Sequence, residues 1–318
     1  MHLVVSILIP SYNSELYISE TLDSVLSQTY TNWECIIVDD HSTDNSVKII
    51  NSYCQKYPKK FKLFSNPHKG ACAARNYAFE KSTGDYIQYL DADDLLTSDK
   101  IEQQIKLLYN KNHEVLASSR WDFFYDSSDN HSVERCIYKN YDNPLILLSD
   151  IWTKGEMMAN STWLTHRQLI YKAGTWKKEL LINQDGEFFC RILCHAKSVV
   201  FSPIGKVLYR KQNPKSITGG KISYEKALSM LNSYKDYEII LSKLDNISIK
   251  KALANNYLGF IYYIYPLYPD LIKQAEFYFK NLGFNKKWGV GGKKFVIISK
   301  ILGFNNALKI DILTKNFR

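Results

Sequence analysis

Acidic residues gather at two places where the sequence pattern predicts that a buried strand ends. Asp39 and Asp40 follow one apolar run, and Asp91 and Asp93 follow another. Two carboxylates spaced as D-x-D are within reach of one Mg²⁺ or Mn²⁺ ion, which keeps further positions for water and phosphate oxygens. Such a cation offsets the charge that develops on a diphosphate leaving group. An acid of the first cluster could accept hydrogen bonds from a ribose hydroxyl or a base N–H. The alternative for that cluster is helix capping, a role expected for Asp44.

A basic side chain, Arg75, lies within the small-residue segment Lys69–Asn76. Gly70 permits a close approach of the backbone, and the small residues let the arginine lie along the edge of a sheet. The alternative interpretation of Arg75 is an ordinary salt bridge.

The elements that carry these residues are predicted from the apolar spacing of the first half. Continuous apolar runs are typical of strands buried on both faces, and they occur at Val4–Ile9, Glu34–Val38, Phe61–Phe64 and Asp85–Leu90. Helices are predicted from a cap at Asn13 and Ser14 to about Gln28, from the turn at 41–45 to about Tyr57, over Ala71–Lys81, and after a cap at Ser98. Alternating strands and helices predict a mostly parallel, doubly wound α/β sheet, in which ligands bind beyond the carboxyl ends of the strands. Both acidic clusters are predicted at that edge.

The second half has a different pattern. Residues 115–215 are irregular, with short strands and turns, and a helix is predicted to begin near Gln184. Residues 221–318 have the spacing of helices. Because Pro214 and the Gly219–Gly220 pair mark a loop, we expect a domain boundary near residue 220.

Composition limits the possible functions. The chain has 318 residues, 45% hydrophobic and 23% charged, with a formal net charge of +9. This excess favours phosphate or anionic membrane as a partner, and the alternative is an ordinary solvated basic face. The lack of an arginine-rich tract or an aromatic-basic alternation argues against nucleic acid. The six cysteines form no C-x-x-C pair, so we expect no disulfide framework or zinc site, but a reducing cytoplasm. In a cytoplasmic protein the N-x-S/T sequons at Asn160 and Asn246 carry no meaning.

Membrane contact is the other question that composition raises. No signal peptide is expected, and the longest apolar stretch, Phe260–Tyr268, is far shorter than the about 20 residues that a spanning helix needs. Taken together, residues 257–268 and 293–318 nevertheless mix apolar residues with Lys and Arg. Basic amphipathic helices can lie on anionic membranes. The alternative is that these apolar faces pack on the catalytic domain or on a partner subunit.

Taken together, these segments closely resemble the family 2 glycosyltransferases, which have the GT-A fold. The resemblance covers about residues 3–215. It rests on VSILIPSYN (5–13), IIVDDHSTDNS (36–46), NPHKGACAARNYA (66–78) and GDYIQYLDADD (84–94), and more weakly on INQDGEFFCRIL (182–193) and LYRKQNPKSIT (208–218). It implies a Rossmann-like, mostly parallel central sheet flanked by helices, with a C-terminal helical region.

The resemblance also implies a division of the chain. Residues 1–220 would form the catalytic domain, with a nucleotide-sugar-binding half at 1–112 and an acceptor-binding half at 113–220. Residues 221–318 would form the helical region.

The same resemblance implies a donor site. Pro10 and Tyr12 would line the nucleobase pocket, and Asp39, Asp40 and Arg75 would contact the base and the ribose. Asp91 would reach the ribose or the metal, and Asp93 would bind Mn²⁺ or Mg²⁺. Arg210 and Lys211, with Ser216, fall in the loop that closes over the diphosphate.

For catalysis, Asp185 matches the aspartate of the family's Glu-Asp pair, the base that takes a proton from the acceptor hydroxyl. Glu187 is the alternative base. Gln184 stands where the family usually has Glu, and Gln212 stands where many members have His.

The implied function is an inverting, metal-dependent transfer of a sugar from a nucleotide diphosphate donor, a UDP-sugar, to a saccharide or lipid-linked acceptor in surface polysaccharide biosynthesis. The resemblance places such an enzyme in the cytoplasm or on the inner face of the membrane. The chain has neither the membrane helices nor the Q-x-x-R-W motif of the processive synthases. A sugar nucleotidyltransferase, which would need a glycine-rich basic loop in place of SYNSELY, and a non-catalytic nucleotide-sugar binder are the alternatives.

Overall fold

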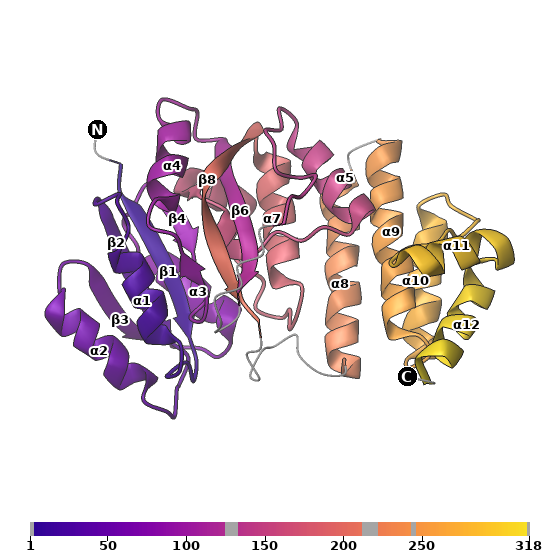
Figure 1. Cartoon of the computed structure of the whole chain (residues 1–318), viewed down its shortest axis with the longest axis horizontal. Coiled ribbons are helices and arrows are strands. Elements are labelled where there is room, and N and C mark those ends of the chain that lie inside the picture. The colour runs from indigo at the N-terminus through magenta and orange to yellow at the C-terminus, as the bar shows by residue number, and fades with distance from the viewer. Residues whose placement is uncertain (1–2, 125–132, 212–221, 243–245, 317–318) are drawn as a thin grey trace. The chain divides into compact units, whose positions relative to one another are not determined.

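The computed structural model describes residues 3–124, 133–211, 222–242 and 246–316. Two compact units interleave along the chain (Figure 1). Unit 1 comprises Met1–Pro144, Met157–Lys178 and Arg191–Ser216, and unit 2 comprises Leu145–Glu156, Glu179–Cys190 and Ile217–Arg318. The expected boundary near residue 220 lies outside the described residues, so the division into domains stays a prediction.

Unit 1 is built on a sheet whose order, among the described residues, is β3-β2-β1-β4-β7 (Figure 1). The parallel strands are β1 (Val5–Ser11), β2 (Trp33–Asp39), β3 (Phe61–Ser65) and β4 (Tyr86–Tyr89). The short β7 (Thr165–His166) is antiparallel to β4. The mostly parallel α/β sheet predicted from the apolar runs is confirmed.

Helices α1 (Ile18–Leu26), α2 (Ser46–Lys56) and α3 (Ala71–Lys81) connect these strands. The chain moves outward from β1 to β2 to β3 and then returns to place β4 on the other side of β1. Because crossovers are right-handed, α1 and α2 share one face of the sheet, where Figure 1 shows them side by side, and α3 covers the other. The strand order therefore reverses between β1 and β4, the position at which open α/β sheets bind ligands.

The helix starts differ from two of the expected caps. Helix α1 begins at Ile18 and not at Asn13, which has a φ of 46° and belongs to the loop after β1. Helix α4 (Lys100–Leu108) has Asp99 and not Ser98 at its N-cap. Asparagine tolerates the left-handed backbone region at modest cost, so Asn13 suits the turn after β1 as well as it would suit a helix cap.

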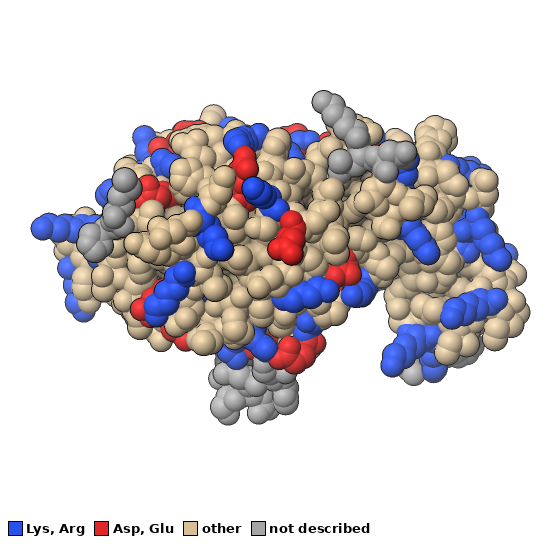
Figure 2. Space-filling view, turned by 90° about the horizontal axis from the view of Figure 1, so that it is seen from above, with Lys and Arg blue, Asp and Glu red and all other residues tan. Residues whose placement is uncertain are grey.

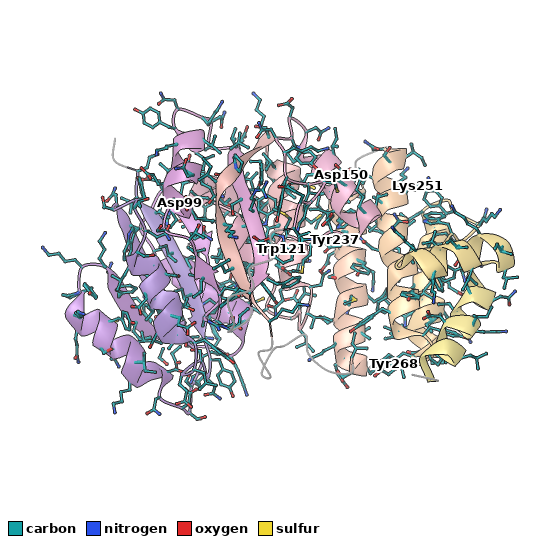
Figure 3. All side chains as sticks on the ribbon, in the orientation of Figure 1. Asp99, Trp121, Asp150, Tyr237, Lys251 and Tyr268 are labelled. Atoms are coloured by element: carbon teal, nitrogen blue, oxygen red, sulfur yellow. The ribbon has the colours of Figure 1, made fainter. Side chains whose placement is uncertain are left out.

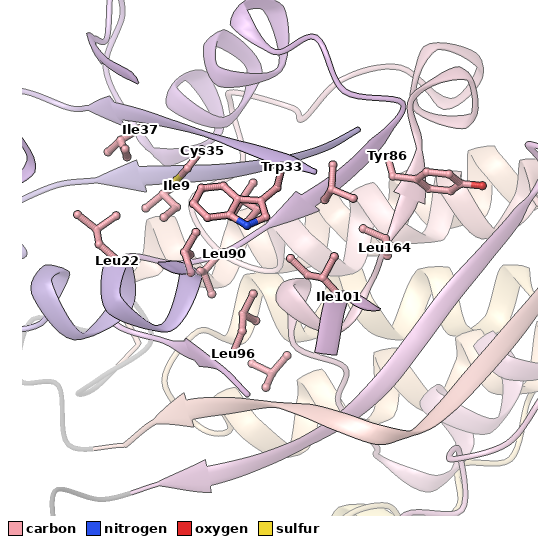
Figure 4. Close-up of a cluster of buried hydrophobic side chains, with 14 of the residues drawn as sticks. Ile9, Leu22, Trp33, Cys35, Ile37, Tyr86, Leu90, Leu96, Ile101 and Leu164 are labelled. Atoms are coloured by element: carbon pink, nitrogen blue, oxygen red, sulfur yellow. The ribbon is translucent and has the colours of Figure 1, made fainter. Parts of the chain in front are cut away.

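The core of unit 1 lies between the sheet and its helices (Figure 4). Ile9 of β1 and Ile37 of β2 pack with Leu22 of α1 and Ile101 of α4, and all four are fully buried. Burying a side chain of this size stabilises the fold by about 1.5–3 kcal/mol. This packing fixes the strand ends on which the acidic clusters lie.

A second sheet of unit 1 has the order β5-β8-β6 among the described residues. Strand β5 (Leu95–Leu96) is antiparallel to β8 (Ser198–Arg210), and β8 is parallel to β6 (Val115–Phe124), with a shift in register between Ser119 and Arg120. The expectation of only short strands at residues 115–215 is wrong. Both long strands mix buried and half-buried positions, so they give no continuous apolar run.

The remaining elements of this region are α5 (Pro144–Lys154), η1 (Asn160–Thr162), α6 (Arg167–Ala173) and α7 (Gln184–His195). The last of these runs from unit 2 into unit 1. The helix predicted to begin near Gln184 is thus confirmed.

Unit 2 contains the helices α8 (Tyr224–Leu241), α9 (Ile247–Ile264), α10 (Pro269–Asn281), α11 (Lys293–Leu302) and α12 (Phe304–Asn316), as predicted for residues 221–318. Tyr237 of α8, labelled in Figure 3, is buried and stacks on Trp152 of α5 at 4.8 Å. Asn183 donates a hydrogen bond to the Tyr237 hydroxyl at 2.8 Å. These contacts join two earlier segments of the chain to the C-terminal helices.

The first of the two segments considered for membrane contact, residues 257–268, is largely buried. In residues 257–268, five side chains are buried within unit 2: Tyr257, Leu258, Phe260, Ile261 and Ile264. For this segment, packing accounts for the apolar residues. Within the described ranges, every helix is too short or too polar to cross a bilayer.

Candidate functional site

The carboxyl ends of β1, β2 and β4 bring the predicted site residues of unit 1 to one edge of the sheet. Ser11 at the end of β1 pairs with Asp39 at the end of β2, and the Asp40 N–H donates to the Ser11 carbonyl at 2.7 Å. Tyr12, the residue after β1, is 60% exposed, and Pro10 is half-buried. An exposed aromatic ring at this edge is a surface on which a flat base could stack.

The two acids after β2 have different partners. Asp39 is buried and accepts hydrogen bonds from the Ser42 N–H at 3.0 Å and the Ser42 hydroxyl at 2.5 Å. Asp40 is half-buried and accepts from Asn66 Nδ2 at 2.7 Å and from the Gly70 N–H at 2.8 Å. Asp39 therefore shapes the turn before α2, while Asp40 fixes the loop before α3.

Asp44 contacts the first residue of α2, although the N-cap position itself is Asn45, which makes no side-chain capping hydrogen bond. Oδ1 of Asp44 accepts from the Ser46 N–H at 2.9 Å, and its Oδ2 accepts from the Glu15 N–H at 3.2 Å. The start of α2 thus engages Asp44 and not Asp40.

Arg75 is held beneath the same edge by α3. Gly70, with a φ of 101°, precedes the helix, and the small residues after it pack closely against the sheet. The Arg75 side chain is 8% exposed; Nη2 lies 2.8 Å from Asp91 Oδ1, and the guanidinium lies 4.7 Å from the centre of the Trp176 ring. The salt bridge considered for Arg75 exists, and its partner is itself a predicted site residue.

Asp91 is bound from two sides. Its Oδ1 accepts from Arg75 and also from Nδ2 of Asn160 at 3.0 Å, while 32% of its side chain stays exposed. Both donors limit the rotation of the carboxylate. The result is a fixed, partly exposed negative group beside the strand reversal.

Asn160 is positioned by a buried polar network under η1. The Ser161 carbonyl accepts from Lys100 Nζ at 2.8 Å and from Gln88 Nε2 at 2.8 Å, and the Thr162 carbonyl accepts from Gln104 Nε2 at 2.9 Å. Burial lowers the pKa of the Lys100 amine well below its ordinary value. A deeply buried polar network of this kind restricts η1 to one arrangement.

The acidic turn after β4 is compact. Asp94 is buried, with Oδ1 accepting the Arg210 N–H at 3.0 Å, and Oδ2 has no hydrogen-bond partner in the described part of the chain. Burial, and then the charges of Asp93 and Asp91, raise the pKa of the Asp94 carboxyl well above its ordinary value. Three carboxyl groups therefore lie close enough to repel one another, an arrangement that a bound cation would relieve.

Arg210, the last residue of β8, contacts the acidic turn that follows β4. Its Nε donates to the Asp93 carbonyl at 2.9 Å, and its Nη2 pairs with Glu20 of α1. The guanidinium also lies over the rings of Tyr17 and Phe124, and the side chain is 2% exposed. These contacts hold the turn in place, and the expected contact of Arg210 with a diphosphate stays a prediction.

Beyond Arg210 the expected closing loop is only partly described. Lys211 is exposed, with Nζ 4.1 Å from the centre of the Phe123 ring. Gln212 and Ser216 lie outside the described residues. The proposed closure over a phosphate therefore stays a prediction.

In the described part of the chain, no three His, Cys, Asp or Glu side chains are placed to hold a metal ion together. Mg²⁺ needs only one or two carboxylates when phosphate oxygens and water complete its shell. Asp91 and Asp93 supply oxygen ligands of the right kind, and after burial their charges are the next causes of the raised pKa of Asp94. The donor set fits a cation that arrives with a diphosphate.

Asp185 belongs to unit 2 and lies in the first turn of α7. It is half-buried, and its Oδ1 accepts the Gly186 N–H at 3.0 Å. Gln184 donates from Nε2 to the Leu180 carbonyl at 2.8 Å, and Glu187 is fully buried. Burial makes Glu187 the less accessible of the two candidate bases, while the role of Asp185 stays a prediction.

Four residues of this region were not foreseen as site residues: Glu20, Lys100, Asn160 and Trp176. Asn160 was considered only as part of a sequon, although it contacts Asp91. Its partner lies 69 positions earlier in the chain, so local spacing gives no signal for the contact.

Comparison with known proteins identifies the family of the chain. Residues 6–173, more than half of the chain, match the family model described as Glycosyl transferase family 2. An uncharacterised glycosyltransferase of Haemophilus influenzae is 43% identical over 121 residues, which are 38% of this chain and 48% of that protein. The UDP-Glc:alpha-D-GlcNAc-diphosphoundecaprenol beta-1,3-glucosyltransferase WfgD of Escherichia coli is 37% identical over 131 residues, 41% of this chain and 49% of that protein. The putative teichuronic acid biosynthesis glycosyltransferase TuaG of Bacillus subtilis is 39% identical over 108 residues, 34% of this chain and 43% of that protein. The chain thus matches about half the length of these relatives.

Two solved structures share the fold. TarS 1–349 of S. aureus, in complex with UDP-GlcNAc, superposes with a TM-score of 0.72 at 16% identity, covering 99% of this chain and 92% of that one. The mannosyltransferase PcManGT of Pyrobaculum calidifontis, in complex with GDP-Man and Mn²⁺, gives a TM-score of 0.53 at 17% identity, over 88% of this chain and 85% of that one. The GT-A fold with C-terminal helices, expected from the sequence, is confirmed.

Proposed function

This chain belongs to glycosyltransferase family 2, and on that premise we propose that it transfers a sugar from a nucleotide diphosphate donor to a saccharide or lipid-linked saccharide acceptor. One observation carries the proposal. An exposed aromatic ring, Tyr12, and the carboxylates of Asp40, Asp91 and Asp93 meet at the carboxyl edge where the strand order reverses. Open α/β sheets bind ligands at such an edge, and a base, a ribose and a metal-bound diphosphate call for groups of these kinds.

The proposed donor is a UDP-sugar. In the proposal, Tyr12 stacks on the base, Pro10 lines the same pocket, and Asp39 and Asp40 accept hydrogen bonds from the base and the ribose. Arg75 supports the base edge and holds Asp91. The donor class draws support from UDP-Glc in the name of WfgD and from UDP-GlcNAc bound to TarS.

Asp93, with Asp91 beside it, is proposed to hold Mn²⁺ or Mg²⁺. When bound, the cation stabilises negative charge on the departing diphosphate. Lys211, with its exposed ammonium group, and Arg210 through its hold on the Asp93 carbonyl, support the same leaving group. The Mn²⁺ in the PcManGT complex supports the choice of metal.

Asp185 is the proposed catalytic base. It takes the proton of the acceptor hydroxyl, whose oxygen then attacks the anomeric carbon as the bond to the diphosphate breaks. A single displacement of this kind inverts the anomeric configuration. The half-exposed position of Asp185, in contrast with the buried Glu187, favours it for this role.

We place the reaction in surface polysaccharide biosynthesis, in the cytoplasm and at the inner face of the membrane. The names of WfgD and TuaG support the pathway, because the first names a diphosphoundecaprenol-linked acceptor and the second names teichuronic acid biosynthesis.

The test is a thermal-shift screen of UDP, GDP and ADP, and of their sugars, each with and without Mn²⁺. A ligand that binds only the folded protein must raise the melting temperature. UDP should stabilise the protein in the presence of Mn²⁺, and Asp93→Ala should abolish that shift. The matched control is Asp142→Ala, an exposed aspartate elsewhere in unit 1. If no nucleotide shifts the melt of the folded wild type, or if the two variants behave alike, the donor site is refuted.

A further inference from the structure

The C-terminal part of unit 2 has an uneven charge. Residues 282–310 contain six lysines and neither aspartate nor glutamate. Figure 2 shows Lys and Arg side chains, in blue, gathered over the C-terminal helices. This positive surface lies in the helical region, outside the residues assigned to the donor site, and the transfer reaction does not use it.

Helix α11 concentrates this charge on one face. Lys293, Lys294 and Lys300 are exposed, and none of them forms an ion pair with a described residue. Ile297 and Ile301, one helical turn apart, are 58% and 75% exposed. At 3.6 residues per turn these five side chains fall within roughly 120° of the helix circumference.

The opposite face of α11 anchors the helix. Phe295 and Ser299 are buried, and the Phe295 ring lies 4.5 Å from the Tyr262 ring of α9 and 5.5 Å from the Phe304 ring of α12. The exposed isoleucines are therefore not needed for packing within unit 2. An apolar strip between lysines, on a helix that is fixed from below, is a surface without a partner in the described chain.

We propose that this face of α11, defined by Lys293, Lys294, Ile297, Lys300 and Ile301, binds the surface of an anionic lipid bilayer. The isoleucines would enter the boundary between headgroups and acyl chains, and the lysines would pair with lipid phosphates. This face would provide the membrane contact proposed above, and its lysines and isoleucines take no part in the transfer reaction.

Two other partners fit this surface less well. A nucleic acid would favour arginine and exposed aromatic rings, whereas residues 282–310 contain no arginine and the exposed apolar residues of this face are aliphatic. A second copy of the chain in a symmetric pair would bring the same three lysines against themselves, which like-charge repulsion opposes.

The experiment is flotation of the full chain with vesicles, in the absence of any sugar nucleotide. Vesicles that contain phosphatidylglycerol should bind the protein and pure phosphatidylcholine vesicles should not, and added salt should weaken binding. The triple variant Lys293→Gln/Lys294→Gln/Lys300→Gln should bind on the order of 100-fold more weakly, since each lysine near an anionic surface contributes a factor of about five. The variant Ile297→Ser/Ile301→Ser should bind the anionic vesicles about tenfold more weakly, because it loses the apolar contact with the acyl chains.

The matched control removes three exposed lysines of unit 1, Lys48→Gln/Lys59→Gln/Lys111→Gln, and so changes the net charge equally. It should bind vesicles as the wild type does. The proposal is overturned if both triple variants lose vesicle binding equally, or if the wild type does not bind anionic vesicles. It is also overturned if the α11 variants lose binding to duplex DNA or to a second copy of the chain instead. The thermal shift with UDP and Mn²⁺, measured on the same variants, reports the donor site separately, so either proposal can fail without the other.

Discussion

Asn160 is the residue whose substitution best separates the proposed donor site from its surroundings. Its Nδ2 donates to Asp91, and its Oδ1 is buried without a hydrogen-bond partner among the described residues. Asn160→Ala therefore removes one side-chain hydrogen bond, and that bond is the one to Asp91. The backbone of η1 keeps its own bonds to Lys100 and Gln88.

The expected loss of free energy follows from the charge of Asp91, the hydrogen-bond partner of Asn160. A hydrogen bond to a charged group contributes about 1.5–3 kcal/mol when it is well shielded. Because 32% of the Asp91 side chain is exposed, water replaces part of the lost interaction, and we expect about 1–1.5 kcal/mol. This corresponds to binding of UDP with Mn²⁺ that is about 5- to 10-fold weaker. Asn160→Asp should lose more, since it sets a second carboxylate against Asp91.

Isothermal titration of UDP in the presence of Mn²⁺ measures this loss directly. Asn112→Ala, which truncates an exposed asparagine of unit 1 far from the acidic turn in sequence, is the control and should bind as the wild type does. Urea unfolding should show that Asn160→Ala is folded, with a free energy of unfolding lower than that of the wild type by no more than about 1.5 kcal/mol, the contribution of the one lost hydrogen bond. If Asn160→Ala binds UDP normally while Asp91→Ala does not, Asn160 does not position the carboxylate and the reasoning is refuted.

Three further predictions concern turnover, packing and pH. Asp185→Asn should keep the thermal shift with UDP and Mn²⁺ but reduce kcat by at least about 100-fold, because a general base contributes that much; unchanged turnover would exclude it as the base. Gly84→Ala should destabilise the fold by about 2–3 kcal/mol in urea unfolding, since a Cβ there would lie 2.5 Å from the Ser6 hydroxyl and 2.7 Å from the Ser6 backbone nitrogen; a loss below about 0.5 kcal/mol would show that β1 shifts easily. Asp94→Asn should gain stability over the wild type as pH rises: the raised pKa of Asp94 means that the folded state holds its proton longer than the unfolded state, so the wild type loses stability from the ordinary carboxyl pKa up to the raised one. Urea unfolding at about pH 5 and about pH 8 checks this, and a difference that shrinks with rising pH would contradict it.

The central sheet could be predicted because its strands are apolar on both faces. Runs such as residues 34–38 are continuous, and the helix over Ala71–Lys81 was predicted at both ends. The positions of Asp39 and Asp91 at the sheet edge then follow from the parallel arrangement alone.

What the sequence could not supply are the contacts between distant segments. Arg210 pairs with Glu20 across 190 positions, and the Lys100 amine is buried under η1 although lysine is ordinarily exposed. Strands β6 and β8 escaped prediction because buried and less buried positions follow one another irregularly along them, and their pairing shifts register between Ser119 and Arg120. Buried polar contacts of this kind depend on tertiary packing, which leaves no periodic trace in a single sequence.

The interleaving of the two units limits how such enzymes can be recombined. Segments 145–156 and 179–190 pack with the C-terminal helices although they are flanked in the chain by parts of unit 1. A chimera that exchanges only the residues after 216 would leave these two insertions facing foreign helices, with Tyr237 lost as the ring on which Trp152 stacks. Grafting of the helical region, in the laboratory or by gene exchange, therefore requires at least three coordinated pieces, so the helices and the segment that carries Asp185 should be inherited together.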